Sequence, residues 1–149
     1  MKRIFVTVGT TPFPRLINAA SVLQGRYECY YQTGDVELPP QYFKFLVNIE
    51  SHVKAADLVI CHCGAGTVYA LLEQRKRILV VPNLDRSDKH QLELAEYVDR
   101  ENLGQVCNDL DALENAVDIA LKREFRVYKK HSFFKYGEIQ EFIDGLRQK

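Results

Sequence analysis

The chain has 149 residues, of which 46% are hydrophobic, and its 20 Lys and Arg residues are balanced by 20 Asp and Glu residues. A chain of this length and composition buries enough apolar surface for one self-sufficient domain, which excludes intrinsic disorder for most of its length. Because the formal net charge is zero, no overall positive field attracts phosphate backbones, and we expect no nucleic-acid partner.

Strand-like and helix-like segments alternate along the whole chain. In chain order, the pattern predicts a strand at 4–8, a helix at 14–24, a strand at 27–32, a loop at 36–42, a short strand at 43–47, a helix at 49–56, a strand at 57–61, a helix at 67–74, a strand at 78–81, a loop at 82–88, a helix at 89–100, an edge strand at 105–107, and helices at 110–121 and 139–146. Such alternation is typical of parallel strands joined by crossover helices. We therefore expect an α/β fold, a Rossmann-like parallel sheet flanked by helices, with residues 1–149 forming a single domain.

No segment of the sequence is suited to crossing a membrane. No uninterrupted apolar run approaches the roughly 20 residues that span a bilayer. The apolar run after Met1 ends at Gly9, before the core of a signal peptide is complete. We expect a cytoplasmic protein with no direct membrane insertion, in which the four scattered cysteines stay reduced.

Cys61-His62-Cys63 is the candidate metal cluster of this sequence. In a strand the two thiols share one face while the imidazole points to the other, and no second ligand pair at zinc spacing follows. We therefore expect no metal and no cofactor. The basic cluster 75–77 lies between a helix and a strand and is predicted to be a solvated turn.

The first candidate ligand-binding loop is Gly9-Thr10-Thr11, directly after the first strand. Ligands of parallel sheets bind beyond the carboxyl ends of the strands. A glycine allows close approach of the backbone, and two hydroxyls with neighbouring amides can donate to phosphate oxygens. The alternative is a plain strand-to-helix turn with a threonine cap.

The second loop is Gly64-Ala65-Gly66-Thr67, between a buried strand and a helix. Two glycines let the backbone approach a ligand, and the amides of a first helical turn carry partial positive charge suited to a diphosphate. The third loop brings Asn83, His90 and Gln91 to the start of a helix, where His and Gln can bond sugar hydroxyls or a phosphate. Its alternative is a solvated helix start.

Four strings carry a resemblance to a known family: Phe5-Val6-Thr7-Val8-Gly9-Thr10-Thr11, Ala56-Asp57-Leu58-Val59-Ile60, His62-x-Gly64-Ala65-Gly66 and His90-Gln91-Leu92-Glu93-Leu94-Ala95-Glu96. In this order and spacing they resemble the glycosyltransferase family 28 C-terminal domain, over about residues 4–101. More narrowly, the chain resembles stand-alone nucleotide-sugar-binding subunits of split enzymes. These are the catalytic subunit of the dolichol-linked N-acetylglucosaminyltransferase and the small subunit of bacterial exopolysaccharide and capsule transferases.

The resemblance implies one half of a GT-B glycosyltransferase. This half would bind a UDP-sugar, and a separate membrane-anchored subunit would bind the lipid-linked saccharide acceptor and recruit the chain to the inner face of the membrane. The implied enzyme is inverting and metal-independent, acts in surface polysaccharide biosynthesis, and is inactive without its partner. No general base is identified, so no catalytic residue is assigned.

Carried over by position, the resemblance implies that the first loop lines the diphosphate, the second forms the phosphate-binding turn, and His90 with Gln91 contacts the donor sugar or its phosphate. His62 belongs to the same motif, and its alternative is a core histidine. The family usually has a glutamate at position 70 that binds both ribose hydroxyls, and this chain has Ala70. Glu73 lies about 4.5 Å further along the helix and could replace it only if the nucleotide shifted. The family's Gly-x-Pro turn is replaced by residues 75–77.

Two other functions remain open on the sequence. One is a non-catalytic regulatory or partner subunit that kept the fold and lost nucleotide affinity through Ala70. The other is a stand-alone nucleotide-binding or epimerase-like protein, although such enzymes close two domains around a substrate. Near the C-terminus, Phe133, Phe134 and Tyr136 precede the helical pattern at 139–146. The segment 131–149 packs on its own sheet or docks against a partner.

Overall fold

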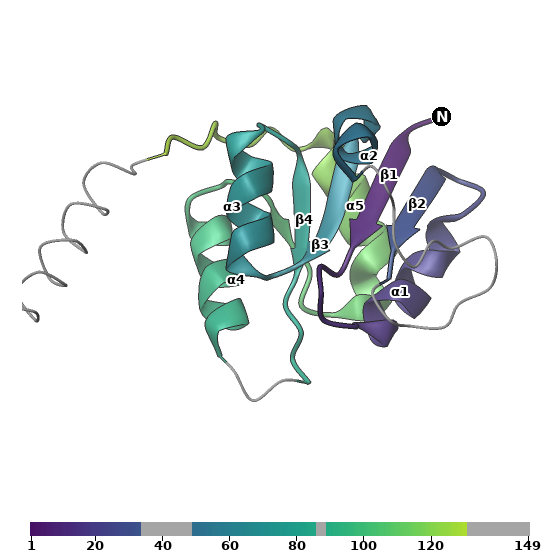
Figure 1. Ribbon diagram of the computed structural model, residues 1–149, viewed down its shortest axis with the longest axis horizontal. Coiled ribbons are helices and arrows are strands. Elements are labelled where there is room, and N and C mark those ends of the chain that lie inside the picture. Colours follow the sequence, from purple (N-terminus) through teal and green to yellow (C-terminus); the bar gives the residue numbers. More distant parts are fainter. Residues whose placement is uncertain (34–48, 86–88, 131–149) are drawn as a thin grey trace, which may run out of the picture.

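A computed structural model describes residues 1–33, 49–85 and 89–130. The strand expected at 43–47, the helix expected at 139–146 and the docking segment 131–149 lie outside the described residues. The described chain forms a five-stranded parallel sheet in the order β2-β1-β3-β4-β5 (Figure 1). Its strands are β1 (Arg3–Thr7), β2 (Glu28–Gln32), β3 (Leu58–His62), β4 (Ile78–Val81) and β5 (Gln105–Val106). The predicted Rossmann-like α/β fold is confirmed.

Helices cover both faces of the sheet, so that the domain has three layers (Figure 1). One face packs against α1 (Pro14–Ala20) and α5 (Leu113–Lys122), and the other against α2 (Ile49–Ala55), α3 (Ala65–Glu73) and α4 (His90–Arg100). Successive strand residues serve opposite layers: Ile4 and Val6 belong to the first core and Phe5 to the second. Burial on both faces explains why β3 and β4 are almost continuously apolar.

Helix ends differ from the predicted bounds for identifiable reasons. Pro14 opens α1 at a position that suits proline, and the expected single helix closes as a 3₁₀ turn, η1 (Ser21–Leu23), before Gly25 with φ +92°. α3 begins two residues before the expected start, because Gly64 acts as its extended N-cap. A 3₁₀ turn, η2 (Leu110–Ala112), precedes α5, so the helix expected at 110–121 is divided.

The solvated turn predicted at 75–77 is wrong for two of its three residues. Lys76 Nζ donates to the carbonyl of Ala56 at 2.7 Å, beyond the end of α2, and Arg77 donates to the carbonyl of Ala120 at 2.7 Å, near the end of α5. Each cation therefore satisfies carbonyls that a helix end leaves open. Arg75 is exposed and has φ +58°, in the left-handed region that favours glycine.

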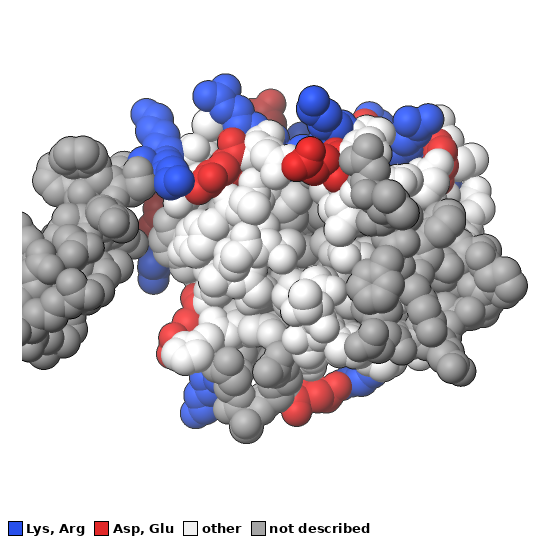
Figure 2. Space-filling view, in the orientation of Figure 1, with Lys and Arg blue, Asp and Glu red and all other residues white. Residues whose placement is uncertain are grey.

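Charged side chains are unevenly distributed over the face that carries α3. Figure 2 shows Lys and Arg side chains along the rim above the amino ends of the strands, and few charges in the middle of this face. No helix within the described residues has the length and apolar character that a bilayer crossing requires.

Candidate functional site

The three predicted loops meet at the same edge of the sheet. β1, β3 and β4 are neighbours and all run parallel, so that their carboxyl ends lie side by side (Figure 1). The loops that leave these ends carry Gly9, Gly64 and Asn83. This is the edge at which parallel α/β sheets bind their ligands.

The imidazole of His62 links the first two loops. A Cβ atom added to Gly9 would lie 2.7 Å from Cε1 of His62, and one added to Gly64 would lie 2.3 Å from its Nε2. The ring therefore lies against the backbone of both glycines. A side chain at either position would collide with the ring, so both glycines are needed for this packing whether or not a ligand approaches their backbone.

Hydrogen bonds beneath the first loop hold its backbone in place. The buried Thr7 hydroxyl donates to Oε1 of Gln32 and accepts from the amide of Gly9 at 3.3 Å. Gly9 itself has φ +66°, so the turn favours glycine on conformational grounds as well.

The amino end of α3 faces this edge without a capping side chain. Gly64 is the N-cap residue, with φ −85° and ψ 130°, and its helix end has no side-chain cap in the described part of the chain. Ala65 and Gly66 are exposed, and no atom lies within 4 Å of a Cβ placed on Gly66. Such an open helix start offers donor amides and partial positive charge to an anion.

A cavity of about 330 Å³ lies between β1, α2 and α3. Its size falls within the range of small-molecule sites. Four predicted residues border it, namely Gly9, Thr10, Gly66 and Thr67. The other lining residues are Phe5, Thr7, Gln32, Ile49, Glu50, Val53, Ala70, Leu71 and Gln74. The structure thus joins the first loop and the second loop around one hollow.

The third loop is built into the fold but does not border this cavity. The side-chain oxygen of Gln91 accepts from the amide of Asn83 at 2.8 Å, which fastens the loop after β4 to the first turn of α4. The His90 side chain is 85% exposed, with Nδ1 3.6 Å from the carboxylate of Glu93. Thr11, also exposed, lies outside the lining as well.

Glu73 does not take the place of the carboxylate missing at position 70. Its carboxylate lies 3.3 Å from Nζ of Lys130, and Glu73 is not among the residues that line the cavity. Gln74, four residues after Ala70, does line it. Helical spacing from Ala70 marks Glu73 at i+3 and Gln74 at i+4 equally, because both share a face with residue i, so the sequence does not decide between them.

Glu50 was missed by the sequence analysis, and no motif marks it. It belongs to the first turn of α2, and its place at the cavity follows from the packing of α2 beside β1 and α3. The same packing brings Val53 into the cavity lining, and its side chain is buried in the core beneath α2 and α3.

The two cysteines of the Cys61-His62-Cys63 string lie in the core beneath α2, α3 and α4. Burial raises the pKa of both thiols, that of Cys63 to about 12. Thiols in this state are poor nucleophiles and poor metal ligands near neutral pH. Within residues 1–33, 49–85 and 89–130, no three His, Cys, Asp or Glu side chains gather as a metal site.

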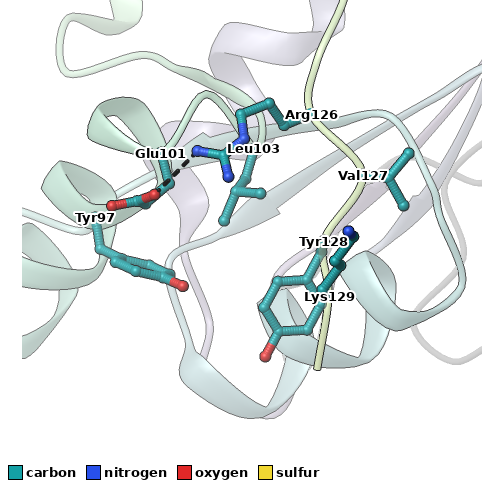
Figure 3. Close-up of a pocket in the computed structure, with 7 residues that line it drawn as sticks. All are labelled: Tyr97, Glu101, Leu103, Arg126, Val127, Tyr128 and Lys129. Atoms are coloured by element: carbon teal, nitrogen blue, oxygen red, sulfur yellow. Dashed lines mark hydrogen bonds and ion pairs between the residues drawn. The ribbon is translucent and has the colours of Figure 1, made fainter. Parts of the chain in front are cut away.

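A second hollow, of about 480 Å³, lies away from the predicted loops, between α4 and residues 126–129 (Figure 3). Tyr97 and Tyr128 line it, and Arg126 pairs with Glu101 at 3.2 Å across its wall. It borders none of the predicted site residues. We therefore take the cavity between β1, α2 and α3 as the candidate functional site.

Comparisons with known proteins give a family model that matches most of the chain. The model describes the glycosyltransferase family 28 C-terminal domain and matches residues 3–142. The human protein UDP-N-acetylglucosamine transferase subunit ALG13 is 35% identical over 119 residues, which covers 68% of this chain and 10% of that protein. The chain thus spans about a tenth of the length of this curated relative.

Two further similarities concern a bacterial enzyme and a solved structure. The UDP-N-acetylglucosamine--N-acetylmuramyl-(pentapeptide) pyrophosphoryl-undecaprenol N-acetylglucosamine transferase of Prochlorococcus marinus (strain MIT 9215) is 26% identical over 105 residues, covering 70% of this chain and 28% of that enzyme. The NMR solution structure of ALG13 matches with a TM-score of 0.62 at 19% identity, covering 87% of this chain and 90% of that one. At this identity the structural match bears on the fold alone.

Proposed function

Because the chain belongs to the glycosyltransferase family 28 C-terminal domain, we propose that it is the UDP-sugar-binding subunit of a split GT-B glycosyltransferase. The observation that carries this proposal is a cavity that the glycine-containing loops after β1 and β3 both border. One end of this cavity lies at the carboxyl edge of the sheet, where an open helix start is available for the diphosphate.

The geometry supports a defined role for the second loop. Transfer of a sugar from a nucleoside diphosphate leaves negative charge on the leaving diphosphate. The amides at the start of α3, beside Gly66 and Thr67, have no capping side chain among the described residues and are available to stabilise that charge. A metal-independent reaction is the finer proposal that follows, and the family resemblance adds inversion at the anomeric carbon to it. We expect UDP to bind equally well in excess EDTA, and that result would support a reaction without a metal ion.

The proposed enzyme needs an acceptor-binding partner. The chain supplies one Rossmann-like half, and the bacterial relative named above is a transferase whose name includes an undecaprenol-linked acceptor. We propose a membrane-anchored subunit that binds a lipid-linked saccharide and brings this chain to the inner membrane face, in surface polysaccharide biosynthesis. The segment 131–149 is the proposed contact, and a chain truncated after Lys130 is expected to lose co-purification with that subunit.

Calorimetry with UDP and candidate UDP-sugars tests the donor-binding function. The proposal predicts heat of binding and a thermal shift, both of which persist when EDTA is present. An absence of heat and of thermal shift at millimolar UDP contradicts it.

Ala70 favours one alternative, a non-catalytic subunit that no longer binds nucleotide. Ala70 lines the cavity and offers no hydrogen-bonding group there. In a nucleotide site, Ala70→Glu is expected to raise UDP affinity, whereas in a cavity with another role it changes nothing. Ala112→Glu is the matched control, because Ala112 is exposed in η2, beside the helices of the opposite face.

A further inference from the structure

Two polar side chains line the candidate cavity together with Ala70. Glu50 reaches it from α2, and Gln74 from the last turn of α3 and its C-cap. The same two residues also line a neighbouring hollow of about 300 Å³, together with Ser51 and Lys54. Glu50 and Gln74 therefore lie where the two hollows adjoin, between α2 and α3.

Neither side chain has a polar partner among the described residues. Throughout the described ranges, no hydrogen bond or ion pair is made by the carboxylate of Glu50 or by the side-chain amide of Gln74. Glu73 differs, since it pairs with Lys130. The two groups that border the cavity thus keep their hydrogen-bonding capacity for a ligand.

Different parts of the cavity lining offer different kinds of contact to a ligand. Phe5, Val53 and Leu71 give it an apolar floor, and Gly66 with Thr67 marks the open start of α3, where the proposed function places the diphosphate. Gln74 follows Gly66 by eight residues, about 12 Å along the helix at 1.5 Å per residue. An anion end, an apolar surface and a carboxylate with an amide in one cavity offer partners for the diphosphate, the base and the ribose diol of a nucleotide.

We propose that Glu50 and Gln74 bind the 2′- and 3′-hydroxyl groups of the donor ribose, so that α2 supplies the carboxylate that Ala70 lacks. This inference rests on the proposed nucleotide-binding function. A carboxylate accepts two hydrogen bonds from a vicinal diol, and the amide of Gln74 can donate or accept beside it. The site is therefore selective for ribonucleotides over 2′-deoxyribonucleotides.

Calorimetry with UDP and 2′-deoxy-UDP on matched variants tests this assignment. The unchanged chain is expected to bind UDP about tenfold or more tightly than 2′-deoxy-UDP, and Glu50→Ala is expected to weaken UDP binding by a similar factor. The same substitution should change 2′-deoxy-UDP binding much less. Gln74→Ala is expected to show a smaller effect in the same direction, and Glu73→Ala none.

A rescue experiment strengthens the test. Ala70→Glu is expected to raise UDP affinity more in the Glu50→Ala chain than in the unchanged chain, because two carboxylates at one diol repel each other. Thermal unfolding of each variant confirms that it is folded.

The possible failures are distinct. If the unchanged chain binds no UDP, the proposed function itself fails. If it binds UDP while Glu50→Ala binds UDP equally well, or if UDP and 2′-deoxy-UDP bind alike, the assignment of Glu50 and Gln74 is overturned and the nucleotide-binding function stands.

Discussion

The two glycines around the start of α3 are predicted to have different roles. Gly64 has ordinary extended dihedral angles, so its need for glycine comes from its neighbour, the imidazole of His62. Gly66 has open space where a Cβ would be and lines the ligand cavity. Gly64→Ala is therefore expected to destabilise the fold, and Gly66→Ala to weaken ligand binding without destabilising it.

The magnitudes follow from the contacts. A methyl group on Gly64 would lie 2.3 Å from Nε2 of His62, and the ring cannot retreat freely because Gly9 is packed on it as well. Overpacking of this kind costs about 1–3 kcal/mol of unfolding free energy. Gly66→Ala removes a glycine from a helical turn and is expected to stabilise the protein by about 0.5–1 kcal/mol.

Urea unfolding and UDP calorimetry on both variants check this prediction. We expect Gly64→Ala to lower the urea midpoint and Gly66→Ala to raise it slightly while weakening UDP binding. His62→Ala is the control, since the cost of Gly64→Ala should largely disappear once the ring is gone. Equal stability losses for the two glycine variants, or an undiminished loss in the His62→Ala chain, would refute the argument.

Three other predictions concern the rest of the described chain. Arg75→Gly is expected to raise the unfolding free energy by about 1 kcal/mol, because φ +58° strains a residue with a side chain; an unchanged urea midpoint contradicts this. Cys61 and Cys63 are expected to resist iodoacetamide at pH 8 until the protein is denatured, since burial raises their pKa, and mass spectrometry of the labelled chain checks it. The hydroxyl of Tyr27, which donates to Asp118, and the charge of Arg26 lower the pKa of Asp118. The ionised carboxylate therefore stabilises the fold above the ordinary carboxyl pKa of about 3.9, and this stabilisation is lost as the pH falls through the lower pKa of the folded state. The stability difference between the parent chain and Asp118→Asn should accordingly narrow below about pH 4 in urea titrations, and a pH-independent difference would count against it.

The sequence alone determined the order and type of the secondary-structure elements in the described chain. Alternation of apolar and polar residues reports local periodicity, and local periodicity sets which element forms. The strand at 78–81 was predicted with its observed bounds. Placement of the loops at one edge also followed, because parallel strands present their carboxyl ends together.

Tertiary packing decided what surrounds each loop. Glu50 and Ala70 are 20 residues apart, and only the packing of α2 beside α3 puts them in one cavity. Whether Glu73 or Gln74 faces that cavity depended on the rotation of α3 against the sheet, which a helical period does not specify. Lys76 likewise bonds the carbonyl of Ala56, which follows α2 and lies 20 residues earlier in the chain.

The contrast has one physical reason. Secondary structure depends on interactions between residues close in the chain, so the sequence pattern carries it directly. The cavity depends on how helices and strands pack through space, where a shift of one helix changes every contact on its face. For this protein, the sequence therefore established the sheet and its candidate loops, and the structure selected the residues that share the cavity.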